Sequence, residues 1–240
     1  MRYVVIDTET TGMDPEADKM VEIAAVWDDG TFAQSLVYPE DRQISFGAMA
    51  THHITHEMVM DAPLAVEVAE VIGLSNLAPD TVLVFHNAAY DRDFLPAELR
   101  EKSWICTYRC ALHLLPDAES HSNGALWYEL GLHHDMPPEA GHMPHRALFD
   151  ALMTSDLMTW MTDQVMPDDG SWEDRLDIAV QKLIELSTAP VVLKKCRFGK
   201  HSGEEWANIP SGYMQWVLRQ DFDQDVKHTC MHWLNERGEA

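Results

Sequence analysis

Hydrophobic and polar positions along the chain predict a mixed α/β fold. Apolar, β-branched stretches typical of strands dominate the first 110 residues, and Asp28-Asp29-Gly30 is a turn signal between two of them. Elsewhere apolar residues recur at helical spacing. We expect strands at 3–6, 20–27, 31–38, 81–86 and 104–107, and helices at 64–74, 87–95, 109–115, 126–132 and 145–161. Strands that alternate with helices after an initial hairpin predict helices packed against a mixed sheet.

The pattern changes after residue 165. Pro167-Asp168-Asp169-Gly170 combines a helix stopper with a turn signal. The elements expected beyond it are a helix at 174–186, a basic strand at 191–195, a glycine-bracketed turn at 198–203, and helices at 211–220 and 225–234. The expected organisation is therefore a larger domain over 1–165, a linker with a helix over 166–189, and a small α+β module over 190–240.

The charge of the chain excludes one common way of holding nucleic acid. The formal net charge is −23 over 240 residues, which does not fit a protein that holds DNA on a broad basic surface. Any nucleic-acid partner must be held locally, by metal ions, backbone amides and a few cationic side chains. The sequence has no apolar run of the ~18–20 residues that a membrane helix needs and no visible signal peptide. Its four scattered cysteines are typical of reduced thiols, so we expect a cytoplasmic protein.

Four acidic residues follow strand ends or lie on helices that can reach them. Asp7 and Glu9 come directly after the first strand, and side chains at i and i+2 of a strand share a face. Asp91 lies one turn into the helix that leaves the strand at 81–86, and Asp150 lies in the helix at 145–161. Each acid alone is explained by solvation. Together at the carboxyl ends of the strands they would repel one another unless divalent cations neutralised them, and carboxylate oxygens suit Mg²⁺ or Mn²⁺.

His145 precedes Asp150 by five residues. On a continuous helix this spacing would turn the two side chains apart by roughly 140°. We therefore expect His145 at the helix start or in the preceding loop, leaning toward the metals. A histidine near neutrality suits a general base that removes a proton from water. The His-rich stretch at 131–144 fits no standard zinc pattern.

Three motifs in this order resemble the DEDD exonucleases, also called proofreading or DnaQ-like exonucleases, of the His subclass (DEDDh). The motifs are Ile6-Asp7-Thr8-Glu9-Thr10-Thr11-Gly12, the segment 86–95 around Asp91, and His145-Arg146-Ala147-Leu148-Phe149-Asp150-Ala151. The Tyr subclass would have a tyrosine four residues before the last acid, where this chain has Arg146. The segment 50–55 also looks like the family's His-x-Ile-Thr element. The resemblance covers residues from about 3 to 162.

This resemblance implies a ribonuclease H-like α/β fold with a mixed five-stranded sheet flanked by helices. It also implies hydrolysis with two Mg²⁺ ions, for which Mn²⁺ can substitute, and release of 5′-mononucleotides from DNA 3′ ends in repair or end trimming. Asp7, Glu9, Asp91 and Asp150 would be the metal ligands, and these four with His145 would be the catalytic residues.

The residues implied to contact the substrate are Thr8, Thr10, Thr11, Gly12, Met13, His52, Asn87 and Tyr90. Thr10, Thr11 and Gly12 offer amides near the terminal nucleotide, and glycine lets the backbone approach it. Met13 is expected to pack either on the last base or in the core.

Two other functions fit the same sequence. An exonuclease that trims RNA 3′ ends would use the same acids, because no residue identifies recognition of the 2′-hydroxyl. A non-catalytic accessory subunit that binds a polymerase or a nucleic-acid end is the second, although an intact set of acids argues against it. Family relatives are often dimers, so a homodimer is a further expectation.

Residues from 190 onward resemble a small module that a member of this family also carries at its C-terminus. The matching positions are Phe198-Gly199-Lys200, Gly203, Ile209-Pro210, Tyr213 and Trp216. The chain's only basic cluster lies here, with aromatic residues interleaved as in surfaces that hold single strands. It comprises Lys194, Lys195, Arg197 and Lys200, with Phe198 and Trp206. The alternative is a solvated turn with aromatic core anchors.

Overall fold

A five-stranded sheet in the order β3-β2-β1-β4-β5 is the framework of the fold. We analysed a computed structural model, which describes residues 2–134 and 143–239. The strands are β1 (Tyr3–Thr10), β2 (Met20–Trp27), β3 (Phe32–Leu36), β4 (Val82–Phe85) and β5 (Trp104–Cys106). The first three are antiparallel, whereas β4 runs parallel to β1 and β5 parallel to β4. The mixed sheet and its five expected strands are confirmed.

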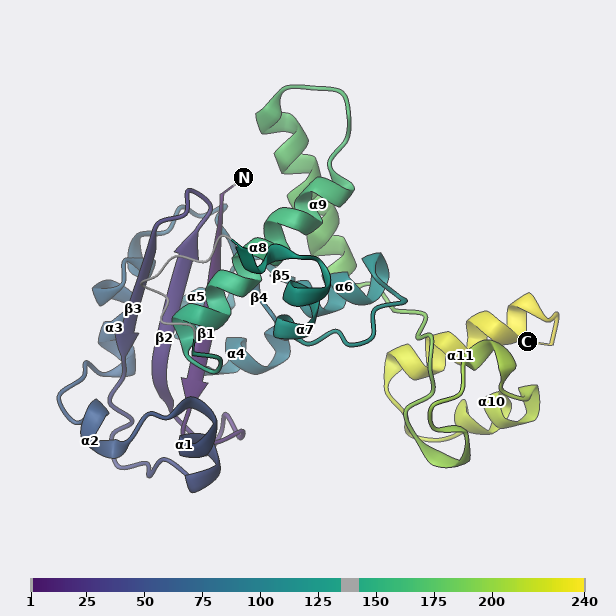
Figure 1. Cartoon of the computed structure of the whole chain (residues 1–240), viewed down its shortest axis with the longest axis horizontal. Helices are drawn as coiled ribbons and strands as arrows, with labels where there is room; N and C mark the ends of the chain where they lie inside the picture. Colours follow the sequence, from purple (N-terminus) through teal and green to yellow (C-terminus); the bar gives the residue numbers. More distant parts are fainter. Residues whose placement is uncertain (1, 135–142, 240) are drawn as a thin grey trace.

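Helices cover both faces of this sheet (Figure 1). One face packs against a core to which α6 (Thr107–Leu114), α7 (Asn123–Glu129), α8 (Ala147–Val165) and α9 (Trp172–Thr188) contribute. The other face packs against α3 (Ala65–Val71), α4 (Ala88–Phe94) and α5 (Ala97–Arg100). Two short helices, α1 (Phe46–His52) and α2 (His56–Val59), belong to a satellite cluster that includes buried Ile54.

The alternation of side chains along β1 decides which acid faces which helix. Val5 belongs to the core under α8, whereas Val4 and Ile6 belong to the core under α3 and α4. Continuing this period of two, Asp7 and Glu9 project on the α8 side of the sheet and Thr8 on the α4 side.

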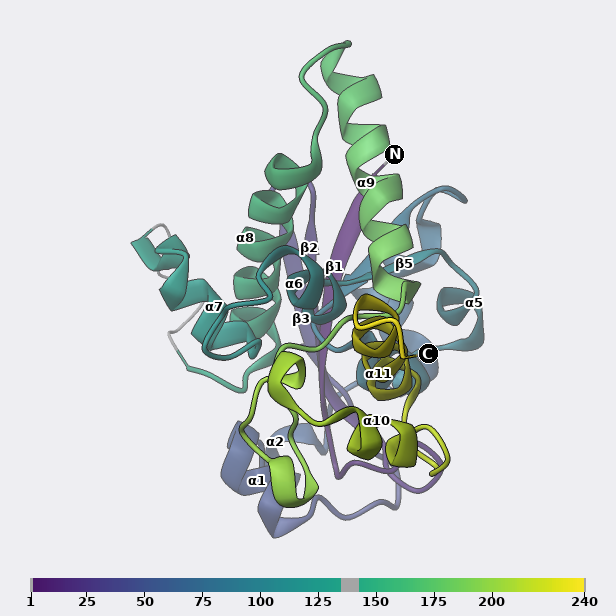
Figure 2. The same ribbon diagram turned by 90° about the vertical axis from the view of Figure 1, so that its right-hand side faces the viewer.

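Residues 166–189, expected as a linker with a helix, contain the whole of α9, whose residues Val180 and Leu183 are fully buried in the larger core. The C-terminal segment has a smaller core of its own, around Trp206 and Met214. Its helices α10 (Ser211–Val217) and α11 (Gln224–Glu236) lie to one side of the larger body in Figure 1 and in front of it in Figure 2. The division of the chain near residue 190 remains a prediction.

The expected strand at 191–195 is wrong. This stretch is extended without a ladder, and its one β-bridge joins Lys195 to Glu205. The backbone N–H groups of Val191 and Leu193 instead donate to the side chains of Asp225 and Thr229 on α11, at 2.9 and 2.8 Å. Side chains of α11 satisfy the backbone that a partner strand would otherwise satisfy. The described part of the module is therefore helical, rather than α+β.

Among the described residues, no helix is long and apolar enough to cross a bilayer. Residues 135–142, at the centre of the His-rich stretch, lie outside the described residues.

Candidate active site

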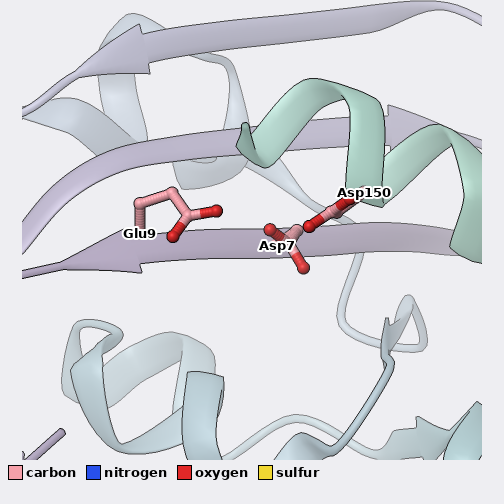
Figure 3. Close-up of side chains that lie close together, drawn as sticks. All are labelled: Asp7, Glu9 and Asp150. Atoms are coloured by element: carbon pink, nitrogen blue, oxygen red, sulfur yellow. The ribbon is translucent and has the colours of Figure 1, made fainter. Parts of the chain in front are cut away.

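Three carboxylates meet where β1 passes beneath the start of α8. Ligand oxygens of Asp7, Glu9 and Asp150 all lie within 4.8 Å of one another. Figure 3 shows the first two side chains rising from β1 and Asp150 reaching toward them from α8. The shared face of residues i and i+2 on β1 explains the first pair, and the first turn of α8 supplies the third acid. The structure therefore brings together three of the four acids that the sequence singles out.

Asp91 approaches from the opposite side of the sheet. It lies on α4, is only 4% exposed, and accepts two hydrogen bonds from Thr8, from the backbone N–H at 3.1 Å and from the hydroxyl at 2.8 Å. Because Thr8 points toward α4, it fixes Asp91 beside Asp7. Thr8, expected to contact substrate, therefore uses its hydroxyl to position a carboxylate.

Burial and mutual repulsion raise the pKa values of all four acids. Burial first, then the charges of Asp91 and Asp150, hold the pKa of Asp7 well above its ordinary value. The pKa of Glu9 rises to about 9, through burial and then the charge of Asp150. Burial also raises the pKa of Asp91 to about 7, against the hydrogen bonds from Thr8, and that of Asp150 to about 6. Clustered oxygen ligands that cannot all ionise alone are what a hard divalent cation stabilises, so these residues fit such an ion.

His145 lies two residues before α8, at an exposed position with φ of 62°. The charge and backbone amide of His145 both oppose the rise in the pKa of Asp150, which places the histidine next to that carboxylate. The structure agrees with the expectation that His145 precedes the helix and leans toward the acids. Its left-handed backbone turns the chain into α8 at this point.

Glu22 and Arg146 form a buried clamp that the sequence analysis did not identify. Glu22 lies on β2 directly opposite Glu9 and is 2% exposed. Its carboxylate forms an ion pair with Arg146, accepting from Nε at 3.0 Å, and also accepts from the backbone N–H of Ala147 at 2.9 Å. A negative charge at a helix N-terminus is favourable. The clamp therefore fixes the start of α8 and, one turn later, Asp150. A lone acid inside the apolar stretch 20–27 was the available signal.

We expect Glu22→Gln to lower the free energy of unfolding by about 3 kcal/mol, because it leaves a largely buried guanidinium without its counter-charge. We also expect it to lower turnover through misplacement of Asp150. Thermal unfolding and steady-state kinetics measure the two effects. Glu70→Gln, at an exposed position of α3, is the matched control for removing the charge of one glutamate. Normal turnover in Glu22→Gln would show that the clamp does not position Asp150.

Thr10, Gly12 and Tyr90 form a second bonded group beside the acids. The Tyr90 hydroxyl donates to the Gly12 carbonyl at 3.1 Å, and the Thr10 hydroxyl lies 2.5 Å from both the same carbonyl and the Tyr90 oxygen. Through Tyr90, α4 thus holds the turn after β1. The Thr11 amide donates to the Lys19 carbonyl at 2.8 Å, so the Gly12 amide remains the candidate contact to a terminal nucleotide.

The side chains expected at Thr11 and His52 to contact substrate instead make internal contacts, and packing inside the protein also explains the glycine at position 12. Thr11 is fully buried, and its hydroxyl donates to Asp18 at 3.0 Å. A Cβ at Gly12 would lie 2.4 Å from the Asp18 carboxylate, so packing inside the protein already requires glycine there. His52 is 2% exposed, with Nδ1 accepting from the Ile54 amide and Nε2 bonded to the Thr10 carbonyl. The side chains of Thr11 and His52 therefore support the turn rather than offer free groups to a substrate.

Met13 and Asn87 are available to a ligand. Met13 is 81% exposed, so of its two expected roles the core role is wrong. Asn87 is exposed, adopts φ of 73°, and makes no capping hydrogen bond to α4 with its side chain. Both residues are free to contact a nucleotide that enters beside the acids.

Comparisons with known proteins place this site in a family. A family model described as exonuclease (RNase_T) matches residues 4–158. Exodeoxyribonuclease 10 of Escherichia coli strain K12 is 32% identical over 96% of this chain and 97% of its own length. The DNA polymerase III subunit epsilon of Treponema pallidum is 34% identical over 66% of this chain and 75% of its own length.

Solved structures agree with this placement. Exonuclease X in complex with 5′ overhanging duplex DNA is 35% identical, with a TM-score of 0.57 over 74% of this chain and 99% of that one. The nuclease domain of 3′hExo, a DEDDh family member, shares the fold at 19% identity, with a TM-score of 0.55 over 68% of this chain and 92% of that one. The expected ribonuclease H-like fold and the resemblance to the DEDD exonucleases are thereby confirmed, and exonuclease X is one of the similar members. The chain belongs to the exonuclease family and is a nuclease of the DEDDh, DnaQ-like type.

Proposed function

We propose that this protein is a 3′-to-5′ exodeoxyribonuclease that uses divalent metal ions, with Mg²⁺ as the natural ion and Mn²⁺ as a substitute. The observation that carries the proposal is the cluster of Asp7, Glu9 and Asp150, with Asp91 held beside it by Thr8. The match to a relative named as an exodeoxyribonuclease over nearly the whole chain supports DNA as the substrate.

The reaction is hydrolysis of the last phosphodiester of a strand. Bound metal ions would activate the attacking water and stabilise the charge that develops on the leaving oxygen. Asp7, Glu9, Asp91 and Asp150 would hold those ions, and His145 would accept the proton of the water as general base. A new oxygen–phosphorus bond forms, the bond from phosphorus to the 3′-oxygen breaks, and a 5′-mononucleotide leaves.

The surroundings of the acids favour a strand end. Met13 is exposed at the turn after β1 and can pack on the terminal base, while the exposed Asn87 can hydrogen-bond the nucleotide. Because the chain carries a net charge of −23, a phosphate next to this cluster needs the cations to offset its repulsion. We propose trimming or repair of DNA ends as the biological setting.

Digestion of end-labelled oligonucleotides tests the function. We expect a 5′-labelled DNA strand to shorten stepwise in the presence of Mg²⁺, with release of mononucleotides, and to stay intact when EDTA removes the metal. A 3′-labelled strand should lose its label in the first step. A matched RNA arm distinguishes the substrates, because faster digestion of RNA would contradict the proposed preference for DNA. Release that begins at the 5′ end would contradict the polarity.

We expect Mg²⁺ to raise the melting temperature more at high pH than at low pH. In the metal-free protein the pKa values of Glu9, Asp91 and Asp150 are raised to about 9, 7 and 6, against about 4 when unfolded. The folded state therefore binds more protons than the unfolded state, and its free energy of unfolding falls as the pH rises from about 4 to 9. Metal binds the ionised carboxylates, so its stabilisation increases over the same range.

Thermal unfolding at about pH 6 and about pH 8.5, with and without Mg²⁺, measures this difference. The Asp7→Asn protein is the control, because it should lose most of the metal-dependent rise at both values. An equal rise at both values would show that the ion does not bind through acids with raised pKa values.

A further inference from the structure

The C-terminal module differs in charge from the rest of the chain. Residues 190–240 contain seven Lys or Arg and seven Asp or Glu, so the formal charge of −23 is carried entirely by residues 1–189. A polyanion would be repelled by most of the larger body and much less by the module. The module is therefore the part of the chain that can bind a nucleic-acid strand with the smallest electrostatic repulsion.

Two aromatic rings on α10 form the centre of a surface strip, in which Trp216 is exposed and Tyr213 is partly buried against the module's core. Tyr213 and Trp216 are three residues apart on the helix, and their ring centroids lie 5.3 Å apart at an interplanar angle of 32°. Trp216 is 46% exposed. The ammonium of Lys200 lies 5.4 Å from the centroid of the Tyr213 ring. Arg219, three residues beyond Trp216, is also exposed. We call these four residues the aromatic strip.

The aromatic strip is held by the structure beneath it. The ring centroid of Phe222 lies 6.2 Å from that of Trp216, and Phe222 stacks on Phe198 with their centroids 4.3 Å apart. Gly199 adopts φ of 62°, and a Cβ there would lie 2.5 Å from the Tyr213 hydroxyl, so the glycine turn lets the tyrosine pack against the backbone. Rings fixed in advance lose little conformational entropy when a ligand stacks on them.

Packing of the module's core does not account for the exposure of Trp216. The core is already filled by residues that are at most 5% exposed, among them Trp206, Met214 and Val217. Two nearby acids have other partners: Glu204 bonds His201 at 3.1 Å, and Asp223 caps α11. Lys200 and Arg219 make no ion pair with any other residue in the described part of the chain.

We propose that the aromatic strip binds single-stranded nucleic acid, with a base stacked on Trp216 beside Tyr213 and phosphates near Lys200 and Arg219. Exposed aromatic rings interleaved with cations are the common solution for holding a single strand without regard to its sequence. The surface is separate from the acid cluster and would add a second grip on the same polymer.

The position of the module fits such a grip. It is attached to the larger body by an ion pair of Arg109 on α6 with Asp225 on α11, and Arg109 also donates to the Ala189 carbonyl at 2.6 Å. Along the direction of the sheet, α10 lies level with the carboxyl end of β1, the end at which the acids gather (Figures 1 and 2). A nucleic-acid strand bound to the module can therefore continue toward that end of the larger body.

Binding of a fluorescent oligothymidylate to the full chain in EDTA tests the proposal without hydrolysis. We expect Trp216→Ala to weaken binding about tenfold, the usual loss for one stacked base. Lys200→Gln should make the slope of log affinity against log salt concentration shallower, by the amount that about one phosphate contact contributes. A matched oligouridylate should bind similarly, because stacking does not depend on the sugar.

Two variants control for the chemistry of these substitutions. Trp172→Ala removes a tryptophan that is 59% exposed at the start of α9, and Lys182→Gln removes an exposed lysine of the same helix. Both should bind as the unmodified protein does. Unchanged binding in both Trp216→Ala and Lys200→Gln, or equal losses in their controls, would overturn the proposal and assign the strip to another kind of partner.

The same variants distinguish this proposal from the catalytic one. Trp216→Ala should leave the turnover number on a dinucleotide unchanged and raise KM on a long single strand. If the unmodified protein releases no nucleotides with Mg²⁺, the proposed function fails while the binding result still stands. If nucleotides are released but the strip variants bind normally, only the aromatic strip is refuted.

Discussion

Asp7→Asn should abolish nucleotide release while the protein remains folded. Asp7 is the acid that lies between the others: it shares a face of β1 with Glu9 and lies beside Asp150. After burial, the charge of Asp91 is the largest cause of the raised pKa of Asp7. Loss of its charge removes a ligand common to the whole cluster. Because bound metal ions supply several kcal/mol of transition-state stabilisation, we expect a loss of about 10³-fold or more in rate.

Stability distinguishes this loss from unfolding. The raised pKa of Asp7 means that its charged form is disfavoured in the metal-free protein. A neutral amide of the same shape should therefore leave the melting temperature in EDTA unchanged or higher, most clearly at high pH. Asp163→Asn, near the far end of α8, is a matched control and should retain activity. Near-normal release of nucleotides by the Asp7→Asn protein would refute the assignment of the site.

Local patterns were sufficient to predict how the acids meet. The period of two along β1 places Asp7 and Glu9 on one face, and the strand-to-helix transitions predict that Asp91 and Asp150 arrive near its carboxyl end. These patterns do not predict on which face of the sheet Asp91 and Asp150 arrive. Only the packing of α8 over one face and α4 over the other shows why Asp91 depends on Thr8, whereas Asp150 joins the first pair directly.

Features that depend on register or burial could not be predicted in this way. The sequence contains 40 acidic residues, and its pattern does not distinguish Glu22 from the others. The pairing of β2 with β1 places Glu22 opposite Glu9, where it also binds Arg146. The role of His52 depends on its burial, which the motif around it does not reveal. The basic stretch at 191–195 has the composition of a strand, but α11 supplies its hydrogen-bond partners, which is a tertiary effect that overrides propensity.

His145 should be the second most sensitive position of the site. We expect His145→Ala to reduce the rate by about 10²–10⁴-fold, the usual contribution of a general base. The histidine is exposed, so added imidazole can reach the same place and should restore part of the lost rate. Steady-state rates across a range of pH measure both effects.

The backbone at this position requires its own control. Because His145 has φ of 62°, alanine there adds strain, whereas asparagine tolerates the left-handed region. His145→Asn should therefore lose as much rate as the alanine variant without its loss of stability. His53 is likewise exposed, with φ of 59°, and His53→Asn controls for loss of a surface histidine in that conformation. A His145→Asn enzyme with unchanged rate would remove the histidine from the chemistry and leave proton removal to water or to the acids.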